Sequence, residues 1–115
     1  MAKFNKWDVV LINFPFTDGS NTKLRPAVVW GIVLNEIGEE DVVLCAVSSQ
    51  SGLKGGIDIP ESHPEFSKTG LDKASKILPG KIFTLAKSKI RGSIGAIGPT
   101  LQQQLGRRLQ EIIIK

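Results

Sequence analysis

The sequence predicts an all-β fold with a minor helical part, a small and strongly curved antiparallel barrel covered by one C-terminal helix. Short segments rich in β-branched and aromatic residues alternate with turns built from Gly, Pro, Asn, Asp and Ser. The final segment, from residue 100 onward, instead repeats Leu and Ile at helical spacing. Five or more short strands followed by a single helix favour a small antiparallel barrel.

Length and composition indicate one domain over residues 1–115, because 41% apolar residues in a chain of this size can bury a core. The single Cys45 cannot close an intramolecular disulfide, and one Cys with one His gives no zinc-binding spacing. No apolar run reaches the roughly 20 residues of a membrane helix, and the start MAKFNKWD lacks the apolar region of a signal peptide. We therefore expect a cytoplasmic protein with no membrane segment and no metal.

The first half of the chain predicts three strands. Residues 7–14 (WDVVLINF) are dense in β-branched and aromatic side chains and end at Pro15, and residues 26–34 (PAVVWGIVL) resume a strand after a turn-rich loop. These two segments should form a hairpin with a long loop. Residues 41–47 (DVVLCAV) predict the next strand. Such nearly continuous apolar runs indicate burial on both faces of the sheet.

The second half predicts shorter strands. The central segment is rich in Ser, Gly and Pro, and we expect a surface loop with one short strand at residues 56–59. Residues 76–78 and 81–85 predict two strand pieces bent at Pro79-Gly80, and residues 93–97 predict a last short strand.

The closing helix is the clearest element. Thr100 stands three positions before Gln103, which is the pattern of a capping box. Gly106 should weaken this helix slightly, and we expect it where a close packing contact needs a small residue. The apolar positions at helical spacing are Leu101, Leu105, Leu109, Ile112 and Ile113.

Charge is unevenly distributed along the chain. Residues 1–66 contain five basic and nine acidic side chains, whereas residues 67–115 contain ten basic and two acidic ones. A basic half of this kind can neutralise phosphates, although it is equally typical of a solvated surface.

Arg25 and the Ser48-Ser49-Gln50 segment are the candidate functional residues. Arg25 lies where a polar loop meets a buried strand, and Pro26 restricts it to extended backbone geometry. A planar, permanently charged guanidinium suits a phosphate and the added charge of its transition state. Ser48 and its neighbours likewise follow a buried strand and offer hydroxyl and amide groups. His63, the lone histidine, lies between prolines and is expected to be a solvated loop residue rather than a catalytic base.

Four stretches of the chain share the motifs of one protein family. They are DVVLINFPFTDGSNTKLRPAVV, VLCAVSSQ, GLDKASKILPGKIFTL and the closing pattern IG...L...L..II, which together span almost the whole chain. The most specific feature is Lys-x-Arg-Pro followed by Ala-Val-Ser/Thr-x-Gln in this order. With these motifs the sequence resembles the MazF/PemK/Kid toxins of bacterial type II toxin–antitoxin systems.

The resemblance implies an SH3-like barrel that forms a homodimer. It also implies a metal-independent and cofactor-independent endoribonuclease, an mRNA interferase that cuts single-stranded RNA at short motifs and is countered by a cognate antitoxin. By position, Arg25 matches the catalytic Arg of the family and Ser48 stands where the family usually has a catalytic Thr. Attack by the 2′-OH of the RNA would leave 2′,3′-cyclic phosphate and 5′-OH ends. The residues expected to contact RNA are Phe16, Thr17, Lys23, Ser49 and Gln50.

The chain departs from the family pattern at three positions. Trp7 replaces a Gly that commonly precedes the Asp of the first strand, and Ser48 replaces Thr. Ser20 stands near the place where the best-known members carry a Glu, which leaves the general base open. The alternative interpretation keeps the barrel without catalysis, as an inactive homologue that binds RNA or protein or as a CcdB-like gyrase inhibitor. The combination of Arg25 with Ser48 argues against the CcdB-like gyrase inhibitor, and the inactive homologue stays open.

Overall fold

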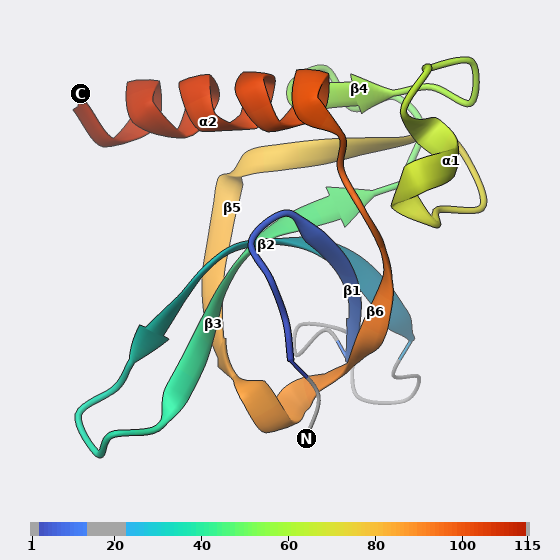
Figure 1. Ribbon diagram of the computed structural model, residues 1–115. Helices are drawn as coiled ribbons and strands as arrows, with labels where there is room; N and C mark the ends of the chain where they lie inside the picture. The colour runs from blue at the N-terminus through green and yellow to red at the C-terminus, as the bar shows by residue number, and fades with distance from the viewer. Residues whose placement is uncertain (1–2, 14–22, 115) are drawn as a thin grey trace.

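A computed structural model describes residues 3–13 and 23–114 of the chain, with side chains up to Ile112. Six antiparallel strands form one curved sheet in the order β4-β5-β3-β2-β1-β6, and helix α2 lies across one side of it (Figure 1). This arrangement confirms the predicted mostly β fold with a C-terminal helix. The strands are β1 (Asp8–Asn13), β2 (Leu24–Leu34), β3 (Glu40–Ser48), β4 (Ile57–Ile59), β5 (Ser75–Ala86) and β6 (Ile90–Ala96). The helices are α1 (Phe66–Thr69), the 3-10 turn η1 (Lys87–Lys89) and α2 (Pro99–Ile114).

The observed boundaries agree well with prediction for the first hairpin and less well later. β1 and β2 pair antiparallel, as expected, but β2 begins at Leu24 and so includes Arg25. β6 begins at Ile90 rather than at residue 93. The predicted central loop contains the short helix α1, which ends at Gly70 in a left-handed conformation with φ of 75°. A four-residue helix is too short for apolar periodicity to reveal it.

β5 is one continuous strand with a corner, not two separate pieces. Its pairing with β3 jumps at Pro79-Gly80, because Cys45 pairs with Ile82 whereas the next residue, Ala46, pairs with Leu78. Proline has no N–H to donate, so the ladder is interrupted there and the strand bends. Figure 1 shows this corner in β5 beside α2. The predicted bend is therefore confirmed.

The sheet is buried on both faces, as the continuous apolar runs indicated. The neighbouring residues Val9 and Val10 are both fully buried, yet they belong to different clusters on opposite sides of β1. Burial raises the pKa of the Cys45 thiol to about 11, so this residue acts as a small apolar core residue. The helix-side core comprises Val9, Val28, Cys45, Val47, Ile57, Ile59, Ile77, Ile97, Leu101, Leu105 and Leu109. The inner core comprises Phe4, Val10, Ile12, Ala27, Val29, Val42, Leu44 and Ile90.

The N-terminus of α2 is capped by a residue far away in the sequence, so the predicted capping box is wrong. The helix begins at Pro99, and proline is favoured in this first position. The backbone N–H groups of Thr100 and Leu101 donate to the carboxylate of Glu65 at 2.9 and 3.1 Å. Thr100 is therefore a donor inside the first turn. A Cβ on Gly98 would approach Glu65 Cδ at 2.6 Å, so glycine leaves room for this carboxylate.

This cap predicts a pH-dependent contribution to stability. Burial acts to raise the pKa of Glu65, but the hydrogen bonds from the first turn of α2 outweigh it and lower the pKa below the usual 4.5. The stabilisation is complete above the usual pKa and is lost as the pH falls through the folded value. We expect Glu65→Gln to lower the free energy of unfolding by about 1 kcal/mol at pH 7 and by less at pH 3. Urea denaturation at the two pH values measures this, and an equal loss at both would contradict it.

Trp7 adopts a backbone conformation that favours glycine, and β1 consequently starts one residue later than predicted. Its φ is 80°, which is rare for a bulky residue. The conformation is held by two backbone hydrogen bonds, from Trp7 N–H to Val29 O at 2.7 Å and from Ile97 N–H to Trp7 O at 3.0 Å. The Trp7 ring packs edge-on against Trp30 at 5.5 Å, and Lys6 Nζ lies over both rings. These contacts stabilise Trp7 in a backbone conformation that glycine adopts more easily. Glycine is also the residue that commonly stands at this position in the family that the sequence resembles.

Candidate active site

Arg25 and Ser48 are brought together by the register between β2 and β3. The β2–β3 ladder ends at the pair Ala27 and Ala46, and continuing its register by two residues along each strand puts Arg25 across from Ser48, just beyond the last paired residues. Residues directly opposite each other in an antiparallel pair project from the same face of the sheet. Both residues line one cleft of about 460 Å³. A guanidinium and a hydroxyl therefore share a solvent-accessible space at the end of two strands.

The backbone of Arg25 is held firmly although its side chain is exposed. β2 lies between β1 and β3, and Arg25 pairs with Ile12 across the β1 ladder. Pro26 follows and keeps Arg25 extended, while Ala27 and Val28 just beyond are completely buried. The core thus anchors the strand from which the guanidinium projects.

Ser48 forms a local turn at the end of β3. Its Oγ accepts the backbone N–H of Gln50 at 3.1 Å, and its hydroxyl hydrogen remains available to donate. Ser48 and Ser49 line the Arg25 cleft as well as an adjoining hollow of about 400 Å³, and Gln50 lines only that hollow. The three polar residues predicted after β3 therefore form a continuous polar wall that begins beside Arg25.

The opposite wall of the cleft is the segment between α1 and β5, which sequence reasoning did not single out. The buried Thr69 fixes its start, because Thr69 Oγ1 donates to Phe66 O at 2.6 Å and accepts Leu71 N–H at 3.1 Å. Its end is fixed by Ser75, whose hydroxyl donates to Lys73 O at 2.9 Å. The pair Asp72-Lys73 between these anchors is exposed and lines the cleft. The segment belongs to the stretch GLDKASKILPGKIFTL that resembles the toxin family, but neither Asp72 nor Lys73 was predicted as a site residue.

The lining of the cleft is predominantly positive. Lys23, Arg25 and Lys73 supply three cationic side chains, and Asp72 supplies one carboxylate. In the described part of the chain, no three His, Cys, Asp or Glu side chains gather to hold a metal ion. Such a lining suits a phosphate, because a guanidinium and a hydroxyl can hydrogen-bond to its oxygens while the flanking lysines add attraction.

The other predicted site residues have different placements. Lys23 is exposed and lines the cleft, whereas Phe16, Thr17 and Ser20 lie outside the described residues. His63 lies in a loop, as predicted, but it is half-buried and its Nδ1 accepts the N–H of Glu65 at 3.0 Å. His63 does not line the cleft that contains Arg25.

The fold and the cleft together define a small antiparallel β protein with a cleft at a strand end whose lining contains three cationic side chains and one carboxylate. Over residues 5–113 the chain matches the family described as PemK-like, MazF-like toxin of type II toxin–antitoxin system, and it belongs to this family. None of the individual curated proteins compared with the chain matches it significantly. Membership in this family implies an antitoxin as partner. No helix within the described ranges is long and apolar enough to cross a membrane.

Proposed function

We propose that this toxin is a sequence-specific, metal-independent endoribonuclease that cleaves single-stranded RNA in the cytoplasm. The observation that supports the proposal most strongly is that Arg25 and Ser48, at neighbouring ends of β2 and β3, line one cleft rich in positive charge. Family membership supports the toxin role. RNA supplies its own nucleophile, the 2′-OH. The protein therefore has only to align the reacting groups, to stabilise the charge of the transition state and to move protons.

The proposed reaction is an internal transfer at one phosphodiester. The 2′-oxygen forms a bond to phosphorus while the bond from phosphorus to the 5′-oxygen breaks, giving a 2′,3′-cyclic phosphate and a 5′-OH. Arg25 donates hydrogen bonds to the non-bridging oxygens and stabilises the charge of the phosphorane. Ser48 donates its hydroxyl hydrogen to the same phosphate. Asp72 lines the cleft and is our candidate for accepting the proton of the 2′-OH, which the leaving 5′-oxygen must regain from a general acid or from water.

Neighbouring residues would hold the RNA on either side of the cut. Lys23 is placed to neutralise a phosphate beside the cleft, and Ser49 and Gln50 offer hydroxyl and amide groups along its polar wall. Phe16 and Thr17, which lie outside the described residues, complete the proposed set of RNA contacts. Lys73, which the structure adds, extends the positive lining.

The direct test incubates purified protein with a labelled single-stranded RNA in EDTA. The proposal predicts cleavage at a small set of defined sites. RNA binding without cleavage would instead support a non-catalytic barrel, and inhibition of gyrase without any effect on RNA would support a protein-binding toxin.

Ser48 should contribute less to cleavage than Arg25. We expect Ser48→Ala to lower the single-turnover cleavage rate by about 10-fold, because one neutral hydrogen bond to the phosphate is lost, and Ser48→Thr to keep the rate because it keeps the hydroxyl. Binding of an RNA with a 2′-deoxy sugar at the cut site should survive Ser48→Ala. A loss of binding equal to the loss of rate would assign Ser48 to RNA binding alone.

In a bacterial host the toxin should arrest growth, and its antitoxin should restore it. We propose that the protein is a homodimer and that an acidic, partly disordered segment of the antitoxin folds onto it and blocks the RNA site. Strong induction of the toxin alone should stop colony formation, whereas co-expression of the protein encoded beside its gene should rescue it. Normal growth at high levels of folded toxin would contradict this expectation.

A further inference from the structure

Three polar side chains lie in one row across β3, β5 and β4. Ser48 of β3 pairs with Lys76 of β5, and Lys76 pairs with Asp58 of β4. Residues directly opposite each other project from the same face of a sheet, and all three line one hollow. Because strands lie about 4.8 Å apart, the row extends roughly 10 Å from Ser48 to Asp58. This span is comparable with the distance from the phosphate of a nucleotide to the outer edge of its base.

The two residues at the far end of the row form an ion pair whose polar groups have a fixed order. Lys76 Nζ lies 3.0 Å from Asp58 Oδ1 and donates to Gly55 O at 3.1 Å. The side chain of Lys76 is only 22% exposed, whereas that of Asp58 is 73% exposed. One ammonium hydrogen of Lys76 is still available, and the described residues leave Oδ2 of Asp58 free to accept. The pair therefore presents one donor followed by two acceptors, in the order Nζ, Oδ1, Oδ2.

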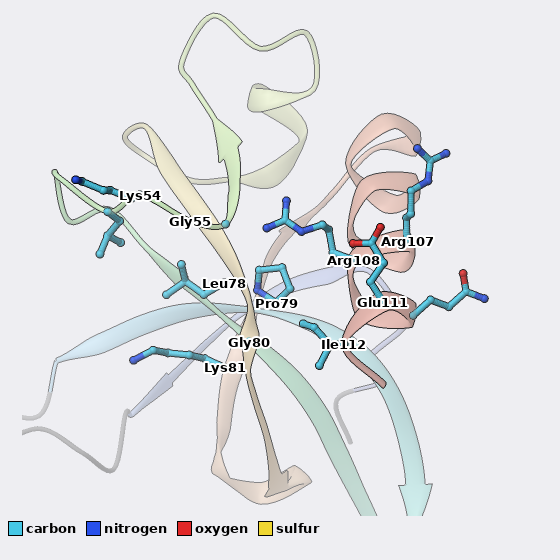
Figure 2. Close-up of a pocket in the computed structure, with 13 residues that line it drawn as sticks. Lys54, Gly55, Leu78, Pro79, Gly80, Lys81, Arg107, Arg108, Glu111 and Ile112 are labelled. Atoms are coloured by element: carbon cyan, nitrogen blue, oxygen red, sulfur yellow. The ribbon is translucent and has the colours of Figure 1, made fainter. Parts of the chain in front are cut away.

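The ion pair lines the hollow of about 400 Å³ that adjoins the Arg25 cleft. The hollow and the cleft have Ser48, Ser49 and Ser75 in common, so the two spaces are continuous. Figure 2 shows Gly55 at the edge of a separate hollow of about 860 Å³. That larger hollow shares no lining residue with the smaller one. The ion pair therefore belongs to the surface that contains the Arg25 cleft.

We propose that Asp58 and Lys76 bind the Watson–Crick edge of a guanine directly beside the scissile phosphate. Along this edge guanine presents one acceptor and then two donors, in the order O6, N1–H, N2–H. This order is complementary to Nζ, Oδ1 and Oδ2 of the ion pair. Proteins commonly read single-stranded RNA through hydrogen bonds to this edge of an unstacked base. The inference rests on the RNA cleavage proposed above and adds the base that the site selects.

The other three bases do not satisfy the same three groups. Uracil has the acceptor O2 where guanine has N2–H, so O2 would face a carboxylate oxygen of Asp58. Cytosine places its acceptor N3 against Oδ1 when its other two groups are paired. Adenine has only one acceptor and one amino group on this edge, which leaves Oδ2 without a donor. A site whose polar groups stay unpaired with the wrong ligand discriminates strongly against it.

The bases that flank the cut test this inference. The full chain is incubated with a randomised single-stranded RNA in EDTA, and the ends of the fragments are sequenced. Guanine should be enriched at one of the two positions beside the cut. Replacing that guanine by inosine, which lacks only the N2 amino group, should lower the cleavage rate by about 10-fold or more, because one hydrogen bond to a charged acceptor is lost.

Asp58→Asn should change the preferred base from guanine to uracil. The substitution replaces one carboxylate oxygen by an NH₂ donor, and the order donor, acceptor, donor complements O4, N3–H and O2 of uracil. We expect the ratio of the cleavage rates on guanine and uracil substrates to fall by about 100-fold. Glu61→Gln also removes one exposed carboxylate, but Glu61 does not line the hollow, so this matched control should keep the ratio of the parent protein.

The possible results separate this inference from the proposed cleavage. RNA cut without a preference for guanine beside the cut, or an unchanged preference in Asp58→Asn, overturns the inference and leaves the cleavage in place. Binding of uncleavable 2′-deoxy RNAs that contain guanine or inosine gives a readout that does not need catalysis. Binding that is about 10-fold tighter with guanine supports the inference even if the protein cuts no RNA. Equal binding of the two RNAs overturns it.

Discussion

Arg25→Ala is expected to lower the rate of RNA cleavage by about 100-fold or more. Removing one preorganised donor that faces the transition-state charge typically costs about 3 to 4 kcal/mol. Arg25→Lys should recover little of this loss, because an ammonium offers a point charge and not the planar fork of a guanidinium. The measurement is the single-turnover rate on one RNA of defined sequence, with enzyme in excess.

Arg91 provides a matched control for this experiment. It is an exposed arginine on β6 that does not line the Arg25 cleft. The cleavage rate of Arg91→Ala should stay within about twofold of the parent rate. A surface charge away from the cleft contributes only to the overall electrostatic potential of the protein. Equal losses in the two variants would mean that net charge, and not the position of Arg25, controls the reaction.

Gly70→Ala is expected to destabilise the protein by about 3 kcal/mol or more. Gly70 has φ of 75°, and a Cβ at this position would collide with the carbonyl oxygen and carbonyl carbon of Ile94. Left-handed strain and overpacking each cost on the order of 1 to 3 kcal/mol. The residue also begins the segment that forms one wall of the cleft, so partial unfolding there should reduce RNA binding. Thermal denaturation followed by circular dichroism measures the loss of stability.

Gly106→Ala should change stability in the opposite direction. We expected Gly106 to permit a close packing contact, but the structure contradicts this, because apart from its chain neighbours and the backbone of α2 itself no described atom lies within 4 Å of a Cβ placed there. Alanine in a helix interior is then favoured by about 1 kcal/mol. A Gly70→Ala protein as stable as Gly106→Ala would show that the backbone around Gly70 relaxes freely.

The sequence predicted best what depends on local composition. β-branched runs identified β1, β2 and β3, and the Pro79-Gly80 dipeptide identified the corner of β5. Opposite Pro79 the ladder has to break whatever the tertiary context, so the signal is local. Burial on both faces also followed from the apolar runs and is confirmed by the neighbouring, fully buried Val9 and Val10.

What the sequence did not predict depends on contacts between distant residues. The cap of α2 comes from Glu65, 35 positions before Thr100, and no local pattern connects the two. Asp72 and Lys73 entered the candidate site only because the segment after α1 folds against the ends of β2 and β3. The proximity of Arg25 and Ser48 followed from the resemblance to a family, whereas its physical reason, the register set by Ala27 and Ala46, required the structure.

Cleavage of two RNAs that differ by one oxygen atom tests the proposed mechanism most directly. One RNA is unmodified and the other carries a single 2′-deoxy sugar at the cut site, and both are incubated with the protein in EDTA. The mechanism predicts that the unmodified RNA is cut to products with 2′,3′-cyclic phosphate and 5′-OH ends, while the modified RNA is bound and stays intact. Cleavage of the modified RNA at the same site, or a requirement for Mg²⁺, would contradict the use of the RNA's own 2′-OH beside Arg25.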